Sequence, residues 1–109
     1  MSEKSIVRWR GKSGKLYDYF VHEAQSYLSP TSGNFIWAKV LPSGSWSAVY
    51  FGEAKNLNEA RGELVFPCAI KYGATHLHLH TTMASQHERQ IEQIDLVEGH
   101  RPPCNQSAQ

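Results

Sequence analysis

The chain has 109 residues, of which 40% are hydrophobic and 19% charged, so it is long enough for one globular domain and too short for two. The formal net charge of +1 excludes a strong overall attraction to nucleic acid. The charge is uneven, however, since residues 1–15 hold five basic residues and one acidic residue, whereas the rest holds six basic and nine acidic residues. We expect a single domain, residues 1–109, with a basic amino-terminal hairpin suited to phosphate contact. A solvated hairpin with chance lysines explains the charge equally well.

The cysteines and the amino terminus indicate a cellular compartment. Cys68 and Cys104 are far apart and form no CxxC pair, and a small secreted fold usually needs more bridges. Residues 1–10 lack the apolar core of a signal peptide, and no apolar run approaches the length that spans a membrane. We therefore expect a cytoplasmic protein of bacterial type, without a membrane partner and with both thiols free.

The first 33 residues predict a hairpin and a connector. Aromatic and β-branched residues at 6–10 and 15–22 flank a glycine-serine turn at 11–14, as in a two-stranded hairpin within residues 1–22. The Gly-Lys-Ser-Gly run is not a phosphate loop, because only two residues separate its glycines where that motif needs four. Residues 23–33 predict an irregular connector.

A second hairpin and a helix follow. Residues 34–41 and 46–51 predict strands around the turn at 42–45. Asn56 is a favourable N-cap for a helix, with Glu59 placed to complete a capping box. Pro67 is expected to interrupt or kink this helix, and Gly73 to end the region.

The last elements are a strand and a helix. Residues 75–82 alternate strictly, which predicts a strand with leucines on one face and histidines on the other. Ser85 and Glu88 predict a capping box for a helix that turns Ile91, Ile94 and Val97 inward and ends at Gly99. Residues 106–109 predict a disordered tail. From residue 34 the order is β-β-α-β-α, which predicts an α/β (α+β) fold: a small central sheet with flanking helices after the amino-terminal hairpin.

This order, with the residues at its joints, resembles the GIY-YIG nuclease family over residues 33–105. Phe35-Ile36-Trp37 stands at the first motif strand, and Tyr50-Phe51-Gly52 at the second motif. Arg89-Gln90-Ile91-Glu92 lies on the late helix, where the family places a metal-binding glutamate, and Pro102-Pro103-Cys104-Asn105 ends the match. The leading hairpin resembles an extension found in a bacterial subgroup of the family.

The resemblance implies a DNA endonuclease that uses two tyrosines, an arginine, a histidine or tyrosine, and a glutamate bound to one Mg²⁺. It assigns catalytic roles to Tyr50, Glu92 and Asn105, with Glu92 as the Mg²⁺ ligand. Each residue also has a structural interpretation. Tyr50 would be a half-buried strand aromatic, Glu92 a helix carboxylate paired with Arg89, and Asn105 a turn cap.

Three catalytic positions depart from the family pattern. Trp37 replaces the first-motif tyrosine and has no hydroxyl, Ala60 replaces the arginine, and Leu64 replaces the histidine. Arg61 is the candidate substitute, although one helical step turns its side chain by about 100°. Since a single charge-stabilising donor is worth about 2.7–4 kcal/mol in the transition state, efficient cleavage is not expected.

Three functions remain open. The first is a DNA-associated domain with an impaired or lost catalytic site, the second an active Mg²⁺-dependent endonuclease that uses Arg61 or Arg89, and the third a structural or adaptor module without nucleic acid. The candidate nucleic-acid contacts are Arg8, Arg10, Lys12, Lys15, Lys55 and Arg89.

The histidines at alternate positions of the last strand have three interpretations. His76, His78 and His80 could chelate Zn²⁺ or Cu²⁺ with a further ligand such as Cys68, Cys104 or Glu92. They could instead form a polar sheet face under a helix or in solvent, or contact phosphate near the site. Side chains on one face of a strand point in parallel and rarely converge on one ion, which favours the polar face.

Overall fold

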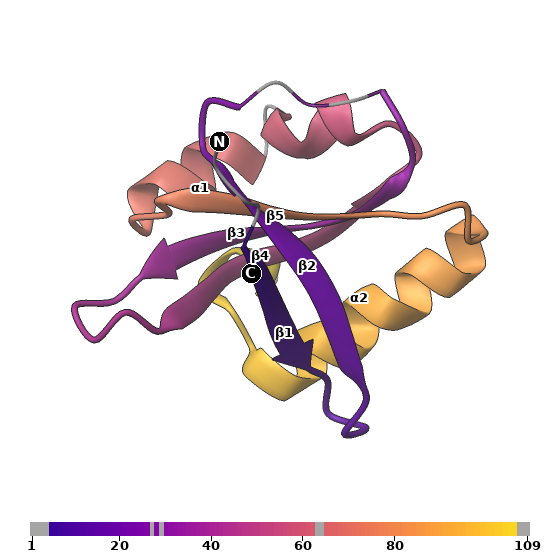
Figure 1. The fold of residues 1–109 in the computed structure, drawn as a ribbon, viewed down its shortest axis with the longest axis horizontal. Helices are drawn as coiled ribbons and strands as arrows, with labels where there is room; N and C mark the ends of the chain where they lie inside the picture. Colours follow the sequence, from indigo (N-terminus) through magenta and orange to yellow (C-terminus); the bar gives the residue numbers. More distant parts are fainter. Residues whose placement is uncertain (1–4, 27, 29, 63–64, 107–109) are drawn as a thin grey trace.

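A computed structural model, which describes residues 5–26, 28, 30–62 and 65–106, shows a five-stranded antiparallel sheet with two α-helices (Figure 1). The predicted α+β class is confirmed, as is the β-β-α-β-α order after an amino-terminal hairpin. The strands are β1 (Ile6–Arg10), β2 (Leu16–Glu23), β3 (Gly33–Val40), β4 (Trp46–Ala54) and β5 (His76–Thr81). The helices are α1 (Val65–Lys71) and α2 (Gln86–His100), with 3₁₀ turns η1 (Leu57–Arg61) and η2 (Pro103–Asn105).

The strand order β1-β2-β5-β3-β4 makes one sheet of the two hairpins. Strand β5 lies between them, because Leu79 is opposite Phe20 of β2 on one side and opposite Phe35 of β3 on the other. The amino-terminal hairpin is therefore an integral part of the sheet. A bulge in the β3–β4 pairing, where Trp37 faces Tyr50 and Ala38 faces Ala48, turns Val49 and Tyr50 to the same side.

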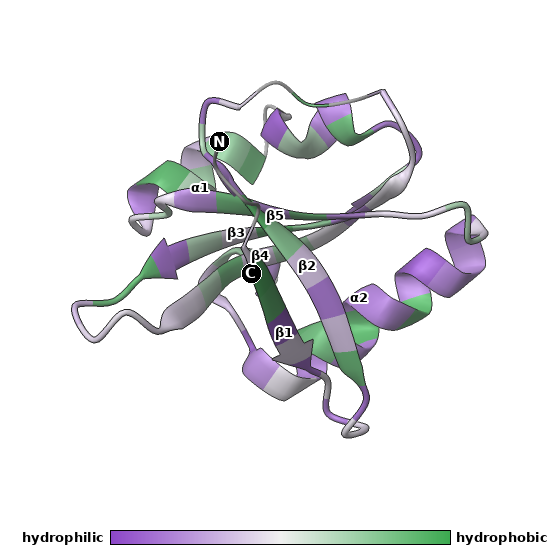
Figure 2. Cartoon of the chain, in the orientation of Figure 1, coloured by the Kyte–Doolittle hydropathy of each residue, from purple (hydrophilic) through white to green (hydrophobic). Residues whose placement is uncertain are grey.

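Hydrophobic clusters pack on both faces of the sheet, and alternation along β3 supplies both of them. Phe35 and Trp37 belong to the cluster under η1 and α1, whereas Ile36 and Ala38 belong to the cluster on the α2 side. Figure 2 shows apolar and polar residues alternating along the strands of the sheet. The η1 side is filled by Leu28, Phe35, Trp37, Val49, Ala54, Leu57, Ala60, Ala69, Leu77 and Leu79.

The predicted helix from Asn56 is split in two. The Asn56 side chain accepts a hydrogen bond from the Asn58 N–H, and η1 ends at Arg61 before α1 begins. The predicted Asn56–Glu59 capping box does not form at this described cap, because the Asn56 side chain binds the N–H of Asn58 instead. Pro67 lies in the first turn of α1, where its missing N–H costs no helical hydrogen bond, so it does not break the helix.

Helix α2 begins at the predicted capping box but buries another face. Ser85 accepts from the Glu88 N–H, and the Glu88 carboxylate accepts from the Ser85 N–H. The inward orientation predicted for Ile91 and Ile94 is wrong, since 52% and 55% of these side chains are exposed. The buried residues are Arg89, Glu92 and Leu96, because α2 lies on a sheet face that is itself partly polar.

The predicted end of α2 at Gly99 is also wrong. The helix continues to His100, and Arg101 takes the left-handed conformation that terminates it. Gly99 instead allows the hairpin turn to approach the helix, since a Cβ there would lie 2.9 Å from the Lys12 backbone nitrogen and 3.2 Å from the Gly11 carbonyl carbon. A methyl group at this position would push the turn away.

The prediction of free thiols is wrong. Cys68 of α1 and Cys104 of η2 form a disulfide across 36 residues of sequence. Their spacing gave no sign of this, because α1 and η2 come into contact only in the folded chain, where each of them also contacts β4. At the carboxyl end, the Gln106 N–H donates to the Pro103 carbonyl, while the rest of the predicted tail lies outside the described residues. No described helix is long and apolar enough to cross a membrane.

Candidate functional site

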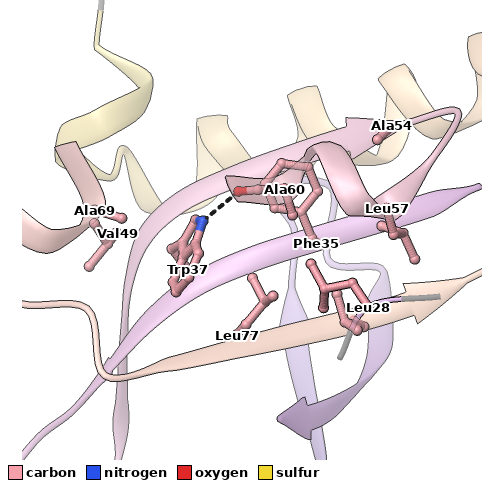
Figure 3. Packing of buried hydrophobic residues seen from close by; sticks show 10 residues of the cluster. Leu28, Phe35, Trp37, Val49, Ala54, Leu57, Ala60, Ala69 and Leu77 are labelled. Atoms are coloured by element: carbon pink, nitrogen blue, oxygen red, sulfur yellow. Dashed lines mark hydrogen bonds between the residues drawn. The ribbon is translucent and has the colours of Figure 1, made fainter. Parts of the chain in front are cut away.

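Trp37 and Ala60, which replace two catalytic residues of the nuclease pattern, meet in the centre of the core (Figure 3). Both are fully buried, and the Trp37 indole N–H donates to the Ala60 carbonyl oxygen at 2.9 Å. The contact joins β3 to η1 and buries both of the positions at which the family has its first tyrosine and its arginine. Leu64, the third substituted position, lies outside the described residues.

Tyr50 packs on the same side of the sheet as Trp37. Its ring centroid is 5.8 Å from that of Phe35, and a Cβ added to Gly52 would lie 2.3 Å from Cζ of Phe35 and 2.7 Å from Cε2 of Tyr50. The glycine of the Tyr-Phe-Gly motif thus makes room for two aromatic rings. Burial, and then the charge of Glu53, raises the pKa of Tyr50, so its hydroxyl keeps its proton at neutral pH.

Arg61 does not take the place of the missing catalytic arginine. Its guanidinium donates to the carbonyl oxygens of Ala24 and Ser26, the latter at 2.7 Å, and burial lowers its pKa. The side chain therefore fastens the connector between β2 and β3. It is not brought together with Tyr50 and Glu92.

Glu92 lies across the sheet from Tyr50. Its Oε2 accepts a hydrogen bond from the Tyr19 hydroxyl at 2.5 Å and lies 3.0 Å from His80 Nδ1. Tyr19 belongs to the cluster on the α2 side, whereas Tyr50 packs against the cluster under η1. The hydrogen bond with Glu92 raises the pKa of His80 against the opposing effect of burial. Sequence reasoning missed Tyr19 as a partner of this carboxylate.

The surroundings of Glu92 do not fit Mg²⁺. One carboxylate oxygen already binds a phenol and faces an imidazole. The adjoining hollow of about 350 Å³ is lined by Lys15 and Arg89 as well as by Glu88, whose carboxylate caps α2. Mg²⁺ requires oxygen ligands in near-octahedral geometry, and cationic side chains oppose its binding. Within the described residues, no three His, Cys, Asp or Glu side chains gather in a way that could hold a metal ion. Glu92 instead positions Tyr19 and His80.

Arg89 is occupied by contacts inside the protein. Its Nε donates to Glu53 at 3.1 Å and its Nη1 to the Ala84 carbonyl at 2.8 Å, with only 6% of the residue exposed. The expected pairing of Arg89 with Glu92 is therefore replaced by an ion pair with β4. Lys55 lines an open hollow of about 730 Å³ beside the acidic residues Glu53 and Glu59, which reduces its attraction for phosphate.

Asn105 completes the outer edge of β4. Its Oδ1 accepts from the Phe51 N–H at 2.7 Å, and its Nδ2 donates to the Phe51 carbonyl at 2.9 Å. The Gln93 side chain donates to the same carbonyl. Both amide atoms of Asn105 thus act as a neighbouring strand would, and they fix η2 beside the sheet.

No protein-family model, curated protein or solved structure matches this chain. The resemblance to the nuclease family therefore rests on the motif residues alone. Trp37, Tyr50, Ala60, Glu92 and Asn105 all have structural partners that explain their presence.

The alternating strand β5 has the predicted faces, with its leucines under η1 and its histidines toward α2. His78 is fully buried, its Nδ1 accepts from the Trp9 indole N–H at 3.1 Å, and its ring packs nearly perpendicular to that of Trp46. Burial is the main reason that the pKa of His78 falls to about 3. Of the three interpretations of His76, His78 and His80, a polar sheet face packed under a helix agrees best with these contacts.

The basic residues of the hairpin lie on the surface. Arg8 and Arg10 point away from α2 on β1, and Lys12 and Lys15 are exposed at the turn. Arg8 Nε donates to Asp18 at 2.8 Å, the one acidic side chain of residues 5–22. Residues 5–22 therefore carry four cationic side chains and one carboxylate, and Glu23 follows at the end of β2.

Asp95 holds this hairpin against the body of the protein. Its carboxylate accepts from the N–H and hydroxyl of Ser13, at 2.8 and 2.7 Å, and from the Tyr17 hydroxyl at 2.8 Å. The hydrogen bonds with Ser13 and Tyr17 lower the pKa of Asp95 against its desolvation. Sequence analysis missed this residue, because no local pattern indicates that α2 meets the turn of the first hairpin.

Proposed function

We propose that this chain is a nucleic-acid-binding domain, with DNA as its partner and with the nuclease chemistry of its motifs impaired or lost. The observation that carries the proposal is the hairpin surface. Arg8, Arg10, Lys12 and Lys15 are exposed on one hairpin, and the carboxylates described near them are Asp18, Glu23 at the end of β2 and Asp95 at the turn. Such clustered cations attract a phosphate backbone even when a protein has little net charge. A cytoplasmic location is part of the proposal, and the Cys68–Cys104 disulfide would be unusual in that reducing compartment.

The loss of cleavage is supported by the positions of the motif residues. Tyr50 and Glu92 lie on opposite faces of the sheet, and Arg61 binds the connector. Phosphodiester cleavage needs an activated water and a stabilised leaving oxygen within reach of the same phosphorus atom. Side chains on opposite sheet faces do not meet that requirement, so binding without cleavage is the function that these positions favour.

The proposal is tested by DNA binding at several salt concentrations. With fluorescence anisotropy on a labelled duplex, three to four phosphate contacts give a slope of log K against log salt of about −3. The Arg10→Glu/Lys12→Glu variant is expected to lose most of that slope. Lys71→Glu reverses the charge of an exposed lysine on α1. This variant is the control and should keep the wild-type slope. A wild-type slope near zero would instead identify a structural or adaptor module.

A further inference from the structure

The outer face of the β1–β2 hairpin carries apolar side chains among its cations. We call this surface the hairpin platform, and it consists of Ile6, Arg8, Arg10, Leu16, Asp18 and Phe20. The antiparallel register places Ile6 opposite Phe20, and Arg10 opposite Leu16. The exposed fractions of Ile6, Leu16 and Phe20 are 57%, 44% and 41%, which makes them three of the nine large hydrophobic residues exposed in the described chain.

Among the described residues, a helix covers the hairpin on its inner side only, which leaves the hairpin platform exposed. The inward residues Trp9, Tyr17 and Tyr19 are buried in the cluster that includes Leu96 of α2. In Figure 1, α2 lies behind the hairpin, and no described helix lies across the face turned to the viewer. The other helix, α1, packs with η1 against β4. An aromatic ring, two aliphatic side chains and two arginines thus share a sheet face that no described helix covers.

We propose that the hairpin platform binds single-stranded nucleic acid, with a base stacked on Phe20 and phosphates on Arg8 and Arg10. This inference rests on the proposed function and gives it a substrate class. Bases in a single strand can be splayed onto an aromatic ring, whereas bases in a duplex are already stacked. A ribbon that enters a duplex groove reads base edges with polar side chains. Phe20 and Ile6 supply apolar surface instead.

The cations are placed to hold the backbone of a strand that crosses this face. Arg8 and Arg10 are two residues apart on β1, about 7 Å along the strand, and both side chains point outward. Arg8 donates to Asp18 through its Nε, and 62% of its side chain is exposed. Its terminal nitrogens are therefore accessible to a phosphate group. Lys12 and Lys15 extend the cationic surface to the turn.

The test compares a labelled oligothymidine with a duplex of equal length. Phe20→Leu removes the ring and keeps an apolar side chain, and it should weaken binding of the single strand about tenfold while leaving duplex binding unchanged. Phe20→Trp should retain wild-type affinity, and its added indole should be quenched by the oligonucleotide but not by inorganic polyphosphate. Tyr72→Leu, which removes an aromatic ring that is 45% exposed after α1, is the matched control and should bind as wild type does.

The outcomes separate the two proposals. If Arg10→Glu/Lys12→Glu weakens binding but Phe20→Leu does not, and the Phe20→Trp indole is not quenched, DNA binding stands and the stacking platform is overturned. If the wild type binds neither form of DNA, the proposed function falls as well. Circular dichroism of each variant shows whether it is folded, and the quenching of Phe20→Trp gives a result that does not depend on the stability of Phe20→Leu.

Discussion

The indole N–H of Trp37 and the carbonyl oxygen of Ala60 form a hydrogen bond between two fully buried residues. A tyrosine and an arginine at these positions would need a solvent-accessible cleft, since their polar ends must reach a phosphate. The indole fills that space and satisfies the η1 backbone. The packing of Trp37 is therefore coupled to that of Ala60.

Loss of this hydrogen bond should destabilise the protein. Trp37→Phe keeps an aromatic ring but leaves the Ala60 carbonyl buried without its donor, which costs about 1–3 kcal/mol. We expect the free energy of unfolding in urea to fall by that amount. Trp46→Phe is the control, because Trp46 is only partly buried, at the margin of the cluster on the α2 side, where its ring packs against those of His76 and His78. Equal losses in both variants would show that ring size, not the hydrogen bond, determines the effect.

Local patterns predicted most of the fold, and the failures have a common origin. The alternation in β5 predicted the two faces correctly, because a strand has a period of two whatever covers it. The apolar positions of α2 predicted the wrong inward face. Arg89 and Glu92 are buried because they find hydrogen-bond partners on a partly polar sheet face, whereas Ile91 remains exposed. The element that packs against a helix determines which face of the helix is buried, and the sequence of one chain does not identify that element.

Contacts between residues that are distant in the sequence could not be predicted for the candidate site either. Motif spacing placed Tyr50 and Glu92 on the expected elements but could not assign the face of the sheet to which each points. The bulge that turns Tyr50 toward Phe35 depends on a one-residue mismatch between β3 and β4. The Cys68–Cys104 disulfide likewise depends on contacts across 36 residues, which carry no signature in the local sequence.

Burial of His78 should make the protein sensitive to acid. Its pKa is lowered to about 3 in the folded chain, against an ordinary value near 6.5 in the unfolded chain, so the neutral ring stabilises the fold above pH 6.5 and this contribution is lost as the pH falls. Between pH 7.5 and pH 5 the loss is about 2 kcal/mol. Urea unfolding at both values measures it.

His78→Gln should be less stable than wild type at pH 7.5 but should lose less stability on acidification. His80 affects the pH dependence of stability in the opposite direction. Because its pKa is raised in the folded chain, its contribution to stability is full below the pKa of the unfolded chain and is lost as the pH rises through the pKa of the folded chain. His87→Gln, at an exposed position of α2, is the control and should retain the wild-type pH profile. An unchanged profile in His78→Gln would show that another group causes the acid sensitivity.

Mg²⁺ should neither stabilise the protein nor activate it through Glu92. We expect the melting temperature to stay constant on titration with Mg²⁺, because Glu92 binds Tyr19 and faces His80. In a plasmid-nicking assay with Mg²⁺, wild type and Glu92→Gln should give the same background, and Glu98→Gln on the exposed side of α2 controls for the change in charge. Nicking that disappears only in Glu92→Gln would establish the alternative, an active endonuclease.

Reduction of the disulfide should loosen the carboxyl end and lower the stability of the whole domain. The bond closes a segment of 36 residues, and a cross-link of that span contributes about 3–4 kcal/mol, mainly by restricting the unfolded chain. We expect dithiothreitol to lower the melting temperature of the wild type and to leave that of Cys68→Ala/Cys104→Ala unchanged. Asn105 reports the local consequence, since amide exchange at Phe51 should accelerate on reduction if η2 leaves the edge of β4. Unchanged exchange at Phe51, together with a lowered melting temperature, would show that Asn105 holds this edge without the disulfide.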